Sequence, residues 1–206
     1  MRYINQPDSR SGRRDQTTSP QNMNSTFLIP SLDDPLSMFA RFHQRTREQC
    51  SALEKLATQV HEVGVDMLAS NAAQRDMAAA VMQFFDHDAR LHHEDEEVVF
   101  FPMLRALKID PDEQLALGKV IQILFDDHRL LEQAWHSLRR SLQAISEGKS
   151  SRVSMDTATF TALYRHHMNG EETGLIPLAQ RYFDPPAIEA LRQALGVRRV
   201  GRGDAG

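Results

Sequence analysis

Histidine and glutamate residues with the same spacing occur at two distant places in the chain, and both residue types can ligate metal ions. His92 precedes Glu96 by four residues, and His167 precedes Glu171 by four residues. In an α-helix this spacing places both side chains on one side of the helix, about 40° apart. A second glutamate and a proline follow each pair at matching offsets, and helix packing requires no such match. We therefore interpret the two segments as a repeat that serves a function.

Both pairs lie on the apolar faces of their helices. Around His92 the apolar stripe comprises Met77, Val81, Phe85, Val99 and Met103, and around His167 it comprises Phe160, Leu163, Tyr164, Leu178 and Tyr182. Two further helical segments direct His43 and His128 inward, and Glu132 lies one turn after His128. The adjacent His93 and the second glutamates of the repeat fall on helix flanks. Four histidines and two or three glutamates thus point toward one interior.

Carboxylates in an apolar interior need a compensating positive charge, because an unpaired buried charge is strongly unfavourable. No lysine or arginine lies near the centre of these stripes, apart from Arg47 at the edge of the first. A single inward histidine is usually an ordinary core residue, but the whole set favours metal cations. Nitrogen and oxygen donors without thiolate suit iron, manganese, zinc or cobalt, and their number fits two ions. The predicted ligands are His43, His92, Glu96, His128, Glu132, His167 and Glu171.

Four long helices must position these residues. Asp-Pro pairs, which combine an N-cap residue with proline at the first helical position, mark the starts of the first and third. Strand-like alternation is missing and the connections are short, which predicts an all-α fold, an up-down-up-down antiparallel four-helix bundle. The expected helices span residues 34–68, 72–107, 111–147 and 154–183, with a short fifth helix at 187–195.

The two ends of the chain differ in composition from its middle. Residues 1–30 and 197–206 are predicted to be disordered tails around a folded metal-binding domain at residues 31–196. The net charge of −4 does not favour nucleic-acid binding, and the longest apolar run, Val98 to Leu104, is too short to span a membrane. A single cysteine, Cys50, excludes an internal disulfide framework. No secretory signal is recognisable, so we expect a cytoplasmic protein.

The chain resembles the bacterial haemerythrin-like domains, also called haemerythrin HHE cation-binding domains. His43 carries this resemblance together with the segments HHEDEEVVFFPML (92–104), DHRLLEQAW (127–135) and HHMNGEETGLIPLA (166–179). The resemblance implies a four-helix bundle around two non-haem iron ions bridged by two carboxylates, with manganese or zinc as possible substitutes. The positions that match the ligands of the family are His43, His92, Glu96, His128, His167 and Glu171.

Two positions depart from the oxygen-carrying members of that family. Glu132 stands where those proteins have a second histidine on the third helix. On the fourth helix those proteins have an aspartate five residues after the histidine, whereas this chain has Glu171 four residues after His167. Simple reversible O₂ carriage is therefore not implied, and Glu132 is predicted as an additional ligand.

The resulting functional hypothesis is a protein that binds or senses O₂, NO or peroxide, or that handles iron. One alternative is an enzyme that uses the same centre to reduce peroxide or to donate iron for iron–sulfur cluster repair. Another is a metal-free helical interaction module. No catalytic residue, membrane contact, nucleic-acid contact or particular protein partner is predicted.

Overall fold

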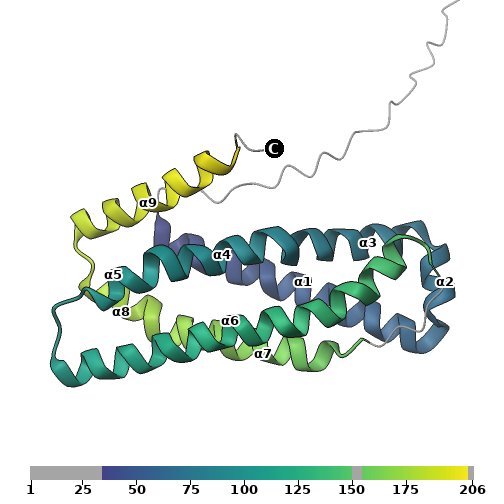
Figure 1. The fold of residues 1–206 in the computed structure, drawn as a ribbon, viewed down its shortest axis with the longest axis horizontal. Helices are drawn as coiled ribbons and strands as arrows, with labels where there is room; N and C mark the ends of the chain where they lie inside the picture. The colour runs from purple at the N-terminus through teal and green to yellow at the C-terminus, as the bar shows by residue number, and fades with distance from the viewer. Residues whose placement is uncertain (1–33, 150–154, 204–206) are drawn as a thin grey trace, which may run out of the picture.

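The computed structural model describes residues 34–149 and 155–203, and every regular element in these ranges is helical, as Figure 1 shows. This confirms the all-helical class predicted from the sequence. The predicted N-terminal tail, residues 1–30, lies outside the described residues. Along the chain the elements are α1 (Pro35–Val63), α2 (Val65–Ser70), α3 (Ala72–Gln83), η1 (Phe84–Asp88), α4 (Ala89–Asp95), η2 (Glu96–Phe100), α5 (Phe101–Arg105), α6 (Pro111–Ser146), α7 (Thr157–Gly170), η3 (Glu171–Leu175), α8 (Ile176–Tyr182) and α9 (Pro185–Gly203), where η marks a π-helical turn.

Local sequence signals define the ends of the long helices. At the start of α1, the Asp34 carboxylate accepts a hydrogen bond from the backbone N–H of Leu36 at 3.2 Å, and Pro35 occupies the first helical position. Asp110 caps α6 in the same way. The predicted first helix is interrupted at Gly64, whose φ of 81° is a conformation that other residues rarely adopt. The chain resumes as α2, which ends at Ser70.

Three π-turns interrupt segments that the sequence predicted as continuous helices. In η2 the N–H of Phe101 donates to the carbonyl of Glu96, and in η3 the N–H of Ile176 donates to the carbonyl of Glu171. A proline follows shortly after each of these turns and has no N–H to offer to the regular hydrogen-bond ladder. Glu96 and Glu171, where these two turns begin, are equivalent residues of the repeat. The sequence repeat is therefore also a structural repeat.

Four helical stretches run lengthwise in Figure 1: α1, α3 to α5, α6, and α7 to α8. Contacts join α3 to α6, α6 to α7, and α1 to both α3 and α7. Their buried apolar side chains form two separate clusters. The first includes Leu53, Phe84, Leu142 and Phe160, and the second includes Phe39, Phe101, Ile121 and Ala179. On each stretch, the site histidines and glutamates lie between residues of the first cluster and residues of the second.

Helix α9 lies tilted beside the α4–α5 stretch (Figure 1) and contacts α1 and η2. Leu191 and Leu195 are completely buried in the second apolar cluster. Residues 197–203, which the sequence predicted as part of a flexible tail, belong to this helix, and residues 204–206 lie outside the described part of the chain. None of the helices in the described ranges is both long and apolar enough to cross a lipid bilayer.

Candidate metal centre

A layer of buried polar residues separates the two apolar clusters. It holds six of the seven predicted ligands, and each of the six exposes no more than 6% of its surface. The six residues come from all four lengthwise stretches: His43 from α1, His92 from α4, Glu96 from η2, His128 from α6, His167 from α7 and Glu171 from η3. Residues far apart in the sequence thus meet at one place.

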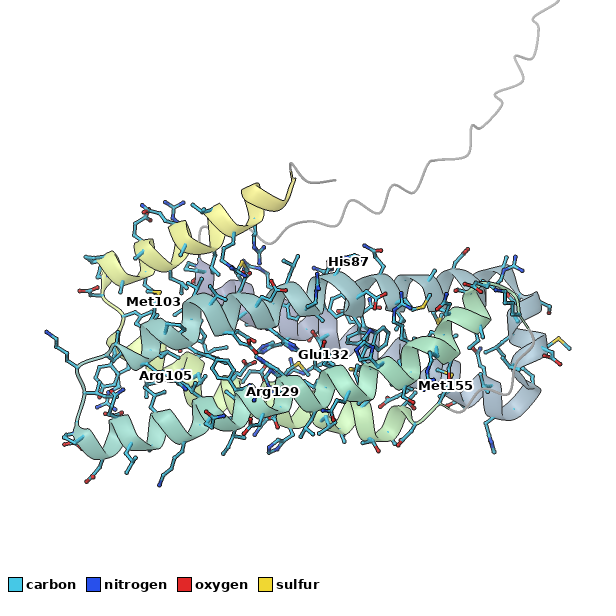
Figure 2. The ribbon with its side chains drawn as sticks, in the orientation of Figure 1. His87, Met103, Arg105, Arg129, Glu132 and Met155 are labelled. Atoms are coloured by element: carbon cyan, nitrogen blue, oxygen red, sulfur yellow. The ribbon has the colours of Figure 1, made fainter. Side chains whose placement is uncertain are left out.

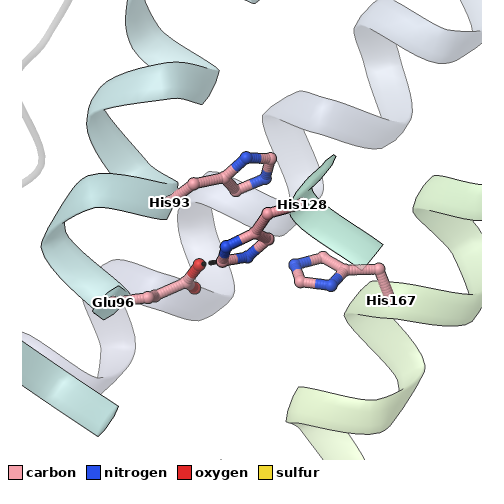
Figure 3. A group of neighbouring side chains, drawn as sticks. All are labelled: His93, Glu96, His128 and His167. Carbon is pink, nitrogen blue, oxygen red and sulfur yellow. Dashed lines mark ion pairs between the residues drawn. The ribbon is translucent and has the colours of Figure 1, made fainter. Parts of the chain in front are cut away.

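The layer contains two groups of side chains that can each hold a metal ion. The first group is His43, His92, Glu96 and Glu171, and the second is His93, Glu96, His128 and His167. In each group one ligand atom per residue lies within 4.8 Å of all the others. Figure 3 shows the second group, with Glu96 directed at His128. Because Glu96 belongs to both groups, the two positions are neighbours.

Each inward glutamate directs one oxygen at each group. For Glu96, Oε1 lies 2.8 Å from Nε2 of His92, and Oε2 lies 3.4 Å from Nε2 of His128. For Glu171, Oε2 lies 2.9 Å from Nε2 of His43, and Oε1 lies 3.6 Å from Nε2 of His167. A carboxylate placed in this way can bridge two cations.

The buried donor atoms fit metal ions better than they fit one another. The Nε2 atoms of all five histidines in the two groups are buried without a hydrogen-bond partner, as are Oε2 of Glu96 and both carboxylate oxygens of Glu171. Several of these atoms lie close enough to pair, but their directions do not meet the geometry of a hydrogen bond. When two ligand atoms each lie about 2.1 Å from one ion and subtend a right angle at it, they lie about 3.0 Å from each other. Their lone pairs then point at the ion and not at each other. The donor set therefore fits a pair of metal cations.

The second glutamate of each repeat holds a histidine from a neighbouring helix. Nδ1 of His128 donates to Glu97 at 2.7 Å, and Nδ1 of His43 donates to Glu172 at 3.0 Å. Arg47 holds Glu172 in turn, with Nη2 at 2.8 and 2.6 Å from its two oxygens. A carboxylate that accepts from Nδ1 leaves the lone pair of Nε2 free for a metal. The two consecutive glutamates of each repeat thus have different roles: the first faces the histidine Nε2 atoms, and the second accepts a hydrogen bond from a histidine Nδ1 atom.

Electrostatics within the layer favour the charged form of Glu96. Burial raises the pKa of Glu96, but the neighbouring rings of His92 and His128 outweigh burial and hold this pKa well below its usual value. Burial lowers the pKa of His128, whereas Glu96 and Glu97 raise it, with a net result of about 8. Burial, together with the positive charge of nearby histidines, lowers the pKa of His93 well below its usual value. His93 is therefore a neutral nitrogen donor at pH 7.

The structure separates Glu132, the seventh predicted ligand, from both groups. Its side chain is exposed on α6, one turn beyond His128. His93 joins the second group instead, and its ring stacks on that of His128 with centroids 4.0 Å apart. A helical wheel places His93 on the flank when all ligands are assumed to point to one position in the core. With two neighbouring metal positions, adjacent residues can face different ions, and the doublet His92-His93 was the available signal.

A pocket with a volume of about 790 Å³ reaches the layer from the surface between α4 and α6. Phe85, Leu131, Trp135 and Tyr164 contribute its apolar walls. Of the residues in the two groups, only His93 and His128 line it. The second metal position is thus the one that the pocket approaches.

Two comparisons with known proteins bear on this site. The family model described as "Hemerythrin HHE cation binding domain" matches residues 34–179. An uncharacterized protein from Haemophilus influenzae is 26% identical over 168 residues, which cover 81% of this chain and 91% of that protein. The matched family region includes every residue of both groups, whereas α9 lies beyond it.

Proposed function

The chain belongs to the haemerythrin HHE cation-binding domain family, and on this premise we propose that its two residue groups hold two non-haem iron ions. We further propose that this centre binds or senses a small molecule such as O₂, NO or peroxide, or takes part in iron handling. In this proposal the four lengthwise helical stretches form the antiparallel bundle of the family. Manganese and zinc are chemically suitable substitutes, because they accept the same nitrogen and oxygen donors.

One observation carries the proposal: two buried glutamates each direct one oxygen at each histidine group. Three of their four oxygens, and the histidine Nε2 atoms that face them, are buried without a hydrogen-bond partner. His43 and His92 would hold the first ion, and His93, His128 and His167 the second. Glu96 and Glu171 would bridge the two ions. Glu97 and Glu172 would not touch the ions, but they accept hydrogen bonds from Nδ1 of His128 and His43. The four negative charges of these four carboxylates would balance the charge of two divalent ions.

The surrounding residues control what reaches the centre. Phe42 stacks on the ring of His92 with centroids 3.9 Å apart, and Phe39 packs against the same ring at 5.5 Å, so water is excluded from the first position. On the opposite side, the pocket leads to His93 and His128. Bound iron ions would supply Lewis acidity and redox chemistry. The protein supplies the ligands, an apolar enclosure and one approach route.

Metal analysis tests this proposal. Protein expressed with sufficient iron should contain about two iron ions per chain, and the double variant His92→Ala/His167→Ala should lose most of them because each group loses a histidine. Spectra of the iron-loaded protein before and after exposure to NO and to peroxide would then identify the small molecule. Well under one transition-metal ion per chain in the unaltered protein would contradict the proposal and favour the metal-free helical module.

A further inference from the structure

The pocket between α4 and α6 contains carboxylates that the proposed ligand set does not use directly. Glu132 on α6 and Glu97 on η2 both line it. Figure 2 shows Glu132 and Arg129 on α6, with His87 on the facing stretch. Within residues 34–149 and 155–203, Glu132 forms no hydrogen bond and no ion pair. Its charge therefore faces solvent and the pocket.

The positive groups in the pocket are already paired. Three arginines line it, and each lies beside a carboxylate: Arg139 beside Asp86 at 2.9 Å, Arg129 beside Asp126 at 2.9 Å, and Arg90 beside Glu94 at 3.8 Å. In the described part of the chain, neither Glu97 nor Glu132 has a lysine or arginine partner. His128 lies 2.7 Å from Glu97 and its pKa is raised to about 8, so it compensates Glu97 at pH 7. Among the described residues, the negative charge of Glu132 is thus left without a positive partner on the pocket wall.

This pocket also brings solvent next to two histidines of the polar layer, His93 and His128. In the first group, His43, Glu96 and Glu171 are each 1% exposed and His92 is 5% exposed, so this group is enclosed. His93 is only partly buried, and the buried Nε2 atoms of His93 and His128 have no hydrogen-bond partner. A cation that enters the pocket would meet carboxylate oxygens first and unpartnered imidazole nitrogens next.

We propose that the pocket is the entry route for the divalent cations that fill the centre, and that Glu132 is a transient capture residue on this route. The inference rests on the proposed metal-binding function. Exposed carboxylates exchange water for a cation readily and hold it weakly, whereas the buried imidazoles and bridging carboxylates hold it in its final place. Glu132 is therefore a loading residue and not a permanent ligand.

Loading kinetics of the full chain test this role. Metal-free protein is mixed with Co²⁺, whose visible absorption reports coordination, and the initial rate is compared with the absorption and stoichiometry at saturation. Glu132→Gln should slow loading about threefold and Glu132→Lys about tenfold at low salt, because attraction of a cation depends on local charge. Both effects should shrink at high ionic strength. Saturation should remain unchanged in both variants.

Glu62→Gln is the matched control, because Glu62 is an exposed carboxylate near the end of α1 and does not line the pocket. It should load at the rate of the unaltered protein. A wild-type loading rate in Glu132→Lys would overturn the inference while leaving the proposed function intact. Fewer bound ions or an altered final spectrum in Glu132→Gln would also overturn it, since Glu132 would then be a permanent ligand. If the unaltered protein bound no Co²⁺, the proposed function and the inference would both fail.

Discussion

At the scale of single residues, His43 and His128 each use their two ring nitrogens for different contacts. Nε2 of His43 faces the buried carboxylates, while Nδ1 donates to Glu172, which Arg47 holds from outside. His128 repeats this division with Glu97. Ring orientation and tautomer therefore depend on residues that do not themselves touch a metal.

The Glu172 contact leads to a prediction about metal affinity. Glu172→Gln should weaken the binding of Co²⁺ about tenfold or more, because the neutral amide orients His43 less firmly and no longer increases the basicity of its ring. Competition with a chelator measures this change. Glu48→Gln is a suitable control, since Glu48 is exposed on α1 and accepts a hydrogen bond from Gln44. Equal affinities in the two variants would refute the positioning role of Glu172.

At the scale of elements, helix α9 closes the side of the protein next to η2. Arg198 Nε lies 2.8 Å from Oδ1 of Asp95, and Arg199 approaches the same carboxylate at 3.5 Å. The Asp95 side chain is 3% exposed and directly precedes Glu96. A helix beyond the matched family region thus neutralises a buried charge next to Glu96.

Removal of this ion pair should destabilise the protein. Arg198→Ala should reduce the free energy of unfolding by about 2 kcal/mol, because Asp95 would keep a buried charge with only the more distant Arg199 beside it. Urea denaturation measures the change. Arg140→Ala, which removes an exposed arginine on α6, should change stability by about 0.5 kcal/mol at most. If the two variants were equally stable, α9 would contribute through Leu191 and Leu195 alone.

At the scale of the whole molecule, the polar layer divides the core into two apolar clusters. Neither cluster can close over the layer without leaving buried charges, so folding and metal binding are expected to be coupled. The histidines and glutamates proposed to ligate metal are then the same residues that join the two halves of the core.

This coupling predicts a large effect of metal on thermal stability. A free metal concentration about 100 times Kd should add about 2.7 kcal/mol to the free energy of unfolding, because the ions bind the folded chain. Calorimetry with and without metal, followed by chelation, measures the resulting shift in Tm. The His92→Ala/His167→Ala variant should show almost no shift. An identical Tm for metal-loaded and chelated unaltered protein would argue against a shared role in folding.

Features that depend on neighbours along the chain were predictable from the sequence. The Asp-Pro starts at Asp34 and Asp110 correctly predicted the beginnings of α1 and α6. The 3.6-residue period correctly predicted that His43, His92, His128 and His167 are buried. These outcomes follow from capping and from the angular position of each residue on its own helix, which nearby residues determine.

Only the tertiary structure decided which side chains meet across helices. It brought His93 rather than Glu132 to the second group, gave Glu97 and Glu172 the task of holding histidines, and extended α9 to Gly203 beside Asp95. Each of these outcomes depends on the distance and rotation between separate helices, which the π-turns at Glu96 and Glu171 also alter. The sequence by itself determined that the residues point inward, and packing determined which of them share a position.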